Sequence, residues 1–121
     1  MSRFVPLALV WLGVAGLAEA GPVVMTAPLV DPSEQRHVVC LVSNLGPQAT
    51  PLSVIAAGPF SMDELANPDA ALPAGGFNQY VSANFAGYCK VTALEGSARG
   101  LRVAACLADA AGTCGAVVEG R

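Results

Sequence analysis

The chain has 121 residues, of which 54% are apolar, and it carries a formal charge of −3. This length fits one small domain and excludes a multidomain enzyme, because a typical domain takes roughly 100 to 200 residues. Nucleic-acid binding is disfavoured, since an acidic chain with only six Lys and Arg residues cannot neutralise a run of phosphates.

The first twenty residues have the pattern of a secretory signal peptide. Arg3 gives a positive start, residues 4–18 form an apolar run, and Ala18-Glu19-Ala20 has the form of a cleavage site. The apolar run is shorter than the ~20 residues of a membrane helix, which disfavours the alternative of a retained anchor. We therefore expect a signal peptide at 1–20 and one exported domain at 21–121. This domain would be soluble in the periplasm or outside the cell, with no membrane span after cleavage.

Strands are the elements predicted for the mature chain. Prolines recur through its first half too densely for a helix of ordinary length. Apolar and β-branched runs bounded by turn residues predict seven strands instead. These strands cover residues 23–29, 36–44, 52–58, 77–84, 87–95, 100–108 and 114–119.

Turn signals separate these strands. Residues 44–48 predict a turn between the second and third strands, and residues 72–76 predict a turn leading into the fourth. Residues 95–100 predict a hairpin loop between the fifth and sixth strands. Residues 61–67 predict a crossover between sheets, where Ser61 and Glu64 form a capping-box pattern that leaves one helical turn open as an alternative.

Seven short strands at this spacing predict an all-β fold. The expected architecture is a seven-stranded antiparallel sandwich of the immunoglobulin-like type, preceded by the signal segment. Alanine is the commonest apolar residue of the mature chain, so its core is expected to be thin. A thin core in a small domain favours covalent cross-links.

The four cysteines of an exported chain predict disulfide bonds, and they lack the C-x-x-C pair that would favour zinc. Strand alternation places Cys89 on an inward face and Cys106 on an outward face. Cys40 shares the inward side of its strand with two valines, and inward cysteines of the second and fifth strands meet across a sandwich core. We therefore expect Cys40–Cys89, and Cys106–Cys114 closing the last hairpin from outside, while the other two connectivities stay open.

Four segments together resemble small exported bacterial proteins. They are CLVSNLG at 40–46, LPAGG at 72–76, YCKVT at 88–92 and LRVAAC at 101–106. The resemblance covers most of the mature chain through weakly specific motifs. It implies an exported immunoglobulin-like sandwich with disulfides, and it brings no activity or functional residue to this sequence.

Catalytic residues are not expected. Nucleophilic catalysis needs a base, and the one histidine, His37, begins a strand beside an arginine, while no G-x-S-x-G motif is present. Asp63, Glu64 and Asp69 offer carboxylates for acid–base work, but they lie in one polar loop that a solvated surface explains as well. We expect a protein that is not an enzyme.

Metal cofactors are not expected either. The acidic loop lacks the D-x-D-x-D-G pattern of a calcium site. His37, Met25 and Met62 are the remaining ligands for copper, and they form no H-x-x-M motif or Met-rich cluster. Core packing explains the two methionines better.

Three basic residues form the predicted contact face. Lys90, Arg99 and Arg102 are expected to share the outer face of the final hairpin, where they either remain solvated or meet an anionic surface.

The favoured function is that of an exported, non-enzymatic module that binds a protein or cell-envelope component through a sheet face or a loop. The alternative is a structural subunit that assembles by strand exchange, with residues 22–30 as the donated strand. Pro28 within that segment favours an ordinary edge strand.

Overall fold

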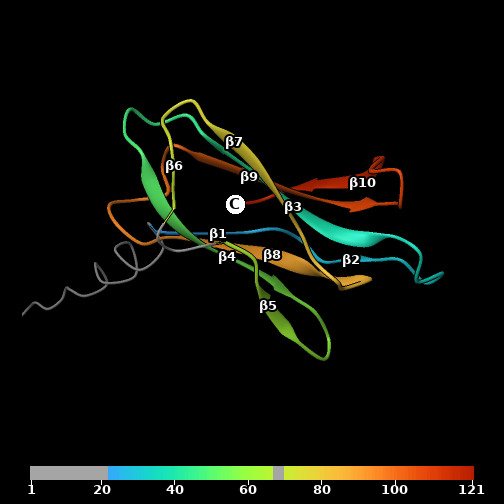
Figure 1. The fold of residues 1–121 in the computed structure, drawn as a ribbon. Coiled ribbons are helices and arrows are strands. Elements are labelled where there is room, and N and C mark those ends of the chain that lie inside the picture. Colours follow the sequence, from blue (N-terminus) through green and yellow to red (C-terminus); the bar gives the residue numbers. More distant parts are fainter. Residues whose placement is uncertain (1–21, 67–69) are drawn as a thin grey trace, which may run out of the picture.

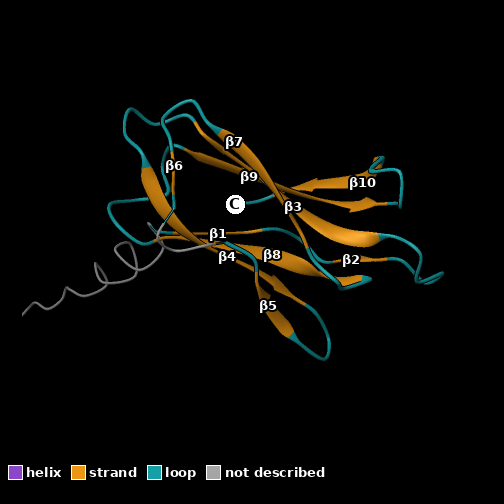
Figure 2. Cartoon of the chain, in the orientation of Figure 1, coloured by secondary structure: helices purple, strands orange, loops and turns teal. Residues whose placement is uncertain are grey.

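The computed structural model describes residues 22–66 and 70–121, and all regular elements in these ranges are strands (Figures 1 and 2). The predicted signal peptide at 1–20 lies outside the described residues. Within the described ranges, no helix is long and apolar enough to span a bilayer. The strands are β1 (Val23–Met25), β2 (Leu29–Val30), β3 (His37–Asn44), β4 (Thr50–Ala57), β5 (Met62–Glu64), β6 (Ala71–Leu72), β7 (Phe77–Val81), β8 (Ala86–Ala93), β9 (Leu101–Ala108) and β10 (Cys114–Glu119).

The strands form two antiparallel sheets that pack as a sandwich (Figure 1). The first sheet has the order β1-β8-β4-β5, with β2 also paired to β8 and β6 to β4. The second sheet has the order β10-β9-β3-β7. The prediction of an all-β, two-sheet sandwich is confirmed.

Every predicted strand is present, but three short strands were not predicted. Residues 23–29 form β1 and the start of β2 rather than one strand. At Thr26 the hydroxyl replaces the backbone carbonyl as the acceptor of the Cys89 N–H, and Pro28 has no N–H to donate. The predicted crossover contains β5 and β6, both paired with β4. The alternative of a helical turn over 61–67 is wrong where the chain is described, because Met62–Glu64 extends along β4 and takes its hydrogen bonds from that strand.

The predicted hairpin at 95–100 is also wrong, because this loop carries the chain from one sheet to the other. Both edges of β8 are occupied, by β4 on one side and by β1 and β2 on the other. β9 pairs instead with β3, from His37 to Asn44. An immunoglobulin domain pairs its last strand with the strand of the second cysteine. Here β10 pairs with β9, and β9 pairs with β3, the strand of the first cysteine. The strand order therefore differs from the immunoglobulin pattern.

The core lies between the inward faces of β3, β4, β8 and β9. Residues alternate between buried and partly exposed along these strands, as the two-residue period predicts. Leu52 and Leu107 are the largest side chains that are almost fully buried, and most of their neighbours are valine, alanine and cysteine. The thin core inferred from the sequence is present.

Both predicted disulfides are present. Cys40 on β3 and Cys89 on β8 join the two sheets through the core, with their Cα atoms 5.8 Å apart. Cys106 and Cys114 join β9 to β10 within the second sheet. Cys106 lies on the face of β9 opposite to the core residue Leu107, as predicted, yet it is fully buried. Two disulfides are typical of proteins in an oxidising, extracytoplasmic environment.

One side of the sandwich is closed by backbone hydrogen bonds between the first and last strands. Met25 exchanges two N–H···O bonds with Arg121, of 3.0 and 2.9 Å, and Thr26 bridges to Gly120. The Gly120 N–H also donates to the Val103 carbonyl. A Cβ at Gly120 would lie 2.9 Å from Val24, so this close approach requires glycine. The free edge of β1 is thereby covered.

A buried carboxylate fixes the connection between β2 and β3. Asp31 accepts hydrogen bonds from the Ser33 hydroxyl at 2.7 Å and from the backbone N–H groups of Ser33, Gln35 and Arg36. The Arg36 guanidinium lies 3.4 Å away. The Ser33 hydrogen bond, followed by those from Arg36 and Gln35, outweighs the opposing effect of burial and holds the pKa of Asp31 well below its usual range.

The free energy of unfolding is therefore expected to fall in acid, where the Asp31 carboxylate becomes protonated. Asp31 binds its proton more readily in the unfolded chain, so its contribution is present above pH ~4 and is lost as the pH falls further. Asp31→Asn should lower the free energy of unfolding most at pH 5 to 7, and the gap to wild type should narrow toward pH 2. Urea unfolding across this range measures the gap; a constant gap would contradict the assignment.

Candidate functional site

The three predicted contact residues do not lie on one face. Lys90 is on β8 in the first sheet, where it pairs with Met25 and Ile55. Arg102 is on β9 in the second sheet, and Arg99 lies in the loop between the two strands. The reason is the crossing of residues 95–100, which separates strands that were expected to form one hairpin.

Arg99 and Arg102 do line one shallow depression on the second sheet, together with Arg121. Arg102 is held there by the backbone just before it, because its guanidinium donates to the carbonyls of Arg99 and Leu101 at 3.1 and 3.0 Å. Glu119 lines the same depression and offsets part of the positive charge. Arg121 was missed from the sequence because its position depends on pairing with β1, far away along the chain.

The residues considered for catalysis are dispersed or take part in structural contacts. His37 packs its ring against Phe85 at a centroid distance of 4.7 Å, and its Nδ1 lies 3.1 Å from the Ser82 carbonyl. Glu64 accepts hydrogen bonds from the Ser53 hydroxyl and the Val54 N–H, which ties β5 to β4. Asp63 precedes Glu64 on β5 and therefore points to the opposite side of the strand.

The candidate metal ligands are also apart. Met25 and Met62 lie on opposite edge strands of the first sheet, and His37 lies on the second sheet. Asp69 of the acidic loop lies outside the described residues. In residues 22–66 and 70–121, no three His, Cys, Asp or Glu side chains gather as a metal site would require.

The most exposed large apolar side chain lies at the tip of the hairpin between β4 and β5. Phe60 is 97% exposed, and Met62, two residues further, is 64% exposed. The hairpin turn is closed by the Gly58 N–H, which donates to the Ser61 carbonyl at 2.7 Å. This hairpin extends beyond the paired layers in Figure 1, so both side chains are presented to solvent.

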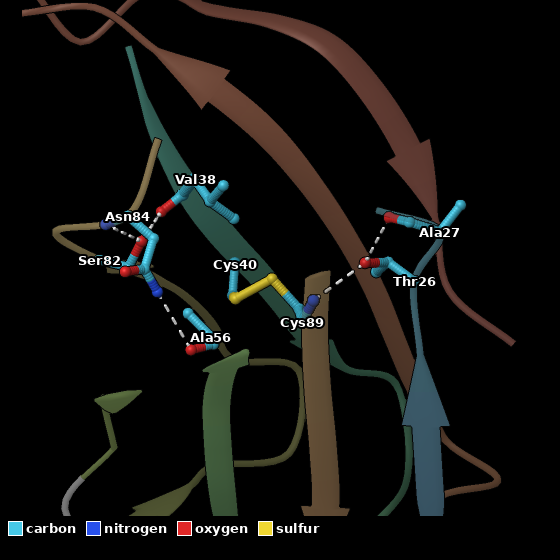
Figure 3. Close-up of a disulfide and its surroundings, with 8 residues drawn as sticks. All are labelled: Thr26, Ala27, Val38, Cys40, Ala56, Ser82, Asn84 and Cys89. Carbon is cyan, nitrogen blue, oxygen red and sulfur yellow. Dashed lines mark hydrogen bonds between the residues drawn. A yellow bond between two sulfur atoms is a disulfide. The ribbon is translucent and has the colours of Figure 1, made fainter. Parts of the chain in front are cut away.

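The base of this hairpin is fixed by a polar network beside the inter-sheet disulfide (Figure 3). The Asn84 amide donates to the Ala56 carbonyl at 3.3 Å, and the Ser61 hydroxyl donates to the Asn84 side-chain oxygen at 3.1 Å. The Ser82 hydroxyl donates to the Val38 carbonyl on β3 at 2.7 Å and accepts from the Asn84 N–H. The hairpin of the first sheet is thus tied to the second sheet.

Two glycines allow the close packing that this base requires. Gly87 on β8 has a φ of +146°, and a Cβ there would lie 2.4 Å from the Ala57 carbonyl oxygen. A Cβ at Gly58 would lie 3.1 Å from Asn84 and from the Ala86 carbonyl. A side chain at either position would therefore collide with the neighbouring backbone.

We take the hairpin tip of Phe60 and Met62, on the base formed by Asn84 and Ser82, as the candidate functional site. Sequence reasoning missed it, although the Gly58-Pro59-Phe60-Ser61 turn carries a signal: an aromatic residue within turn residues has no strand face on which to pack. No family model, curated protein or solved structure matches this chain.

Proposed function

We propose that this protein is an exported, non-enzymatic β-sandwich that binds a protein or cell-envelope component through the β4–β5 hairpin. The observation that carries the proposal is the 97% exposure of Phe60 at the hairpin tip. Transfer of a phenylalanine side chain from water into a pocket is favourable by roughly 1.5–3 kcal/mol. An aromatic anchor of this kind is typical of binding hot spots.

The rigid base strengthens this assignment. Loops that must order on binding lose affinity through conformational entropy, whereas a preorganised loop does not. The Asn84 and Ser82 hydrogen bonds hold the hairpin in place before any partner arrives. Phe60 is therefore presented as a fixed projection for an apolar pocket on the partner.

Export is supported by two independent features. The first twenty residues have the sequence pattern of a signal peptide. Both cysteine pairs form disulfides, which persist in oxidising compartments. We infer a periplasmic or extracellular location from the two together. The likeness to immunoglobulin-type domains that we infer is limited to the disulfide between the sheets.

Strand exchange is less favoured because the proposed donor is used within its own chain. β1 and β2, which cover most of residues 22–30, pair with β8. Thr26 makes two bonds to Cys89, each 3.0 Å long. Its backbone N–H donates to the Cys89 carbonyl, and its hydroxyl accepts from the Cys89 N–H (Figure 3). Donation would also break the pairing of Met25 with Arg121.

Photo-crosslinking tests the proposed function. A photoreactive phenylalanine at position 60 of the oxidised protein should give a discrete adduct in envelope extracts. The same group at position 45 is the matched control, because Leu45 is 64% exposed and lies at the opposite end of β4. Equal adducts at both positions would remove the support for a hairpin site.

Phe60→Ser gives the quantitative arm of the test. This variant should weaken capture of the crosslinked partner by about 30-fold, which corresponds to a hot-spot loss of ~2 kcal/mol. Its melting temperature should remain that of wild type, because the side chain packs on nothing in the folded chain. Leu45→Ser should change neither quantity. Unchanged capture by Phe60→Ser would contradict the proposal.

A further inference from the structure

The four edges of the two sheets are protected to different degrees. β1 is covered by Gly120 and Arg121. β10 has a register shift between Gly115 and Val118 and a positive φ at Ala116, which makes it irregular. β5 is three residues long and carries two carboxylates. Short length, irregularity and charge all hinder edge-to-edge pairing.

β7 has none of these protections. Its five residues contain no charge and no proline, and among the described residues it pairs with β3 alone. Its two apolar side chains on the outer face are largely exposed, Phe77 by 59% and Val81 by 66%. A regular, uncharged and apolar edge is a template for a further strand.

The hydrogen bonds between β3 and the ends of β7 show which N–H and C=O groups of β7 are free to pair with a further strand. Asn44 N–H donates to the Gly76 carbonyl and Ser82 N–H donates to the Val38 carbonyl, so the even-numbered residues of this segment face β3. The N–H and C=O groups of Phe77, Gln79 and Val81 therefore point away from the sheet. Their side chains lie on the outer face, because their partners Ser43, Leu41 and Val39 alternate with the core residues of β3.

The outward N–H and C=O groups of Phe77, Gln79 and Val81 can pair with the same groups of a second copy of β7. We propose that the protein forms a symmetric dimer in which two copies of β7 pair antiparallel, with Gln79 opposite Gln79 of the second copy. In this register Phe77 of each copy faces Val81 of the other, and the available backbone groups of residues 77, 79 and 81 meet one another. The two four-stranded sheets then form one continuous sheet across a two-fold axis.

The distribution of charge along this face favours a second copy of the chain as the partner of β7. Across the sheet, Arg102, Ser43 and Phe77 are cross-strand neighbours. In the dimer this row continues into the second copy, whose residues there are Val81, Val39 and Cys106. No like charges therefore meet along the row. Aromatic residues opposite β-branched ones are favourable cross-strand pairs. Five-residue strands form a contact at or below the ~1,200 Å² lower limit of standard interfaces, so the dimer should be weak, with a Kd on the order of micromolar.

Asn78 competes with this pairing. Its side-chain oxygen accepts the Gln79 N–H at 2.9 Å, and this N–H is one that the second copy would use. Asn78→Ala should therefore strengthen dimerisation. Asn78 is exposed, so the variant is expected to fold as wild type does.

Sedimentation equilibrium of the oxidised protein tests the proposal. Wild type should dimerise with rising concentration, and both Gln79→Lys and Gln79→Glu should weaken the dimer by at least about tenfold, because like charges then face each other across the axis. An equimolar mixture of the two variants should restore dimerisation, since unlike charges meet in the mixed dimer. Thermal melting of each variant controls for folding.

A cysteine crosslink tests the register. Gln79→Cys places two thiols at a cross-strand Cα separation of ~5.5 Å, within reach of a disulfide. It should give a covalent dimer on oxidation, while Ser97→Cys, on an exposed loop, should not. The proposal is overturned by a wild type that stays monomeric at millimolar concentration, by charge variants that still dimerise, or by a mixture that fails to restore pairing. A strand from another protein bound at β7 of a monomeric wild type would likewise overturn it.

Discussion

Replacing Cys40 and Cys89 together by alanine is expected to lower the free energy of unfolding by on the order of 4 kcal/mol. The bond joins residues with a sequence separation of 49. It reduces the conformational entropy of the unfolded chain, and this reduction grows with the length of the closed loop. Both sulfur atoms lie in the core between β3 and β8, so their loss also leaves space among buried side chains. A small domain has a total stability of only 5–15 kcal/mol, so urea unfolding will show the effect clearly.

The second disulfide supplies a matched control. Cys106 and Cys114 are separated by 8 residues, for which the same model gives about 2.5 kcal/mol. This bond joins neighbouring strands of one sheet, whereas the first joins the two sheets. Urea unfolding of the two double variants at one temperature compares them directly. Equal losses would contradict the assignment of the larger role to the inter-sheet bond.

Leu107→Ala is the second change for which we expect a large effect, a loss of 2–5 kcal/mol. Leu107 is 1% exposed and is one of the two largest side chains that are almost fully buried. The core cluster that contains Leu107 is composed mainly of valine, alanine and cysteine, whose short side chains fill a cavity poorly. The loss should therefore lie toward the upper half of this range.

Leu45→Ala removes the same atoms from a loop position, where the side chain is 64% exposed. It should change the free energy of unfolding by no more than ~0.5 kcal/mol. The difference between the two variants isolates the contribution of burial. A small effect at Leu107 would show that the core relaxes around the cavity.

The long strands and the inward or outward side of each cysteine could be predicted because both depend on local alternation. Val38, Cys40 and Val42 alternate with less buried residues, and the face that they share is the core face of β3. The same argument placed Cys89 in the core and Cys106 on the other face. Together with the sandwich architecture, these positions favoured Cys40–Cys89 among the three possible connectivities.

Strand order could not be read in this way. Residues 95–100 have the composition of a hairpin loop, but the loop crosses between sheets because β1 and β4 already occupy both edges of β8. That occupancy depends on residues far away along the chain. The predicted face of Lys90 and Arg102 failed for the same reason, since it assumed that β8 and β9 are neighbours.

The candidate site was the least accessible to sequence reasoning. Ser61 and Glu64 fit a capping box, which drew attention to a helical turn and away from the hairpin. The Glu64 carboxylate in fact bonds to Ser53 and Val54 on β4. The exposure of Phe60 depends on the hairpin projecting from the sandwich, a property of the tertiary structure.

The seam between β1 and the last residues of the chain constrains the order of folding. Met25 and Arg121 lie near opposite ends of the part of the chain that the structure describes, so we expect their contact to form late in folding. A chain whose last residues have not yet docked lacks this seam, and β1 keeps an unsatisfied edge. Such an intermediate is vulnerable to edge-to-edge aggregation until Gly120 and Arg121 reach β1, so the period of risk is set by the last pairing to form.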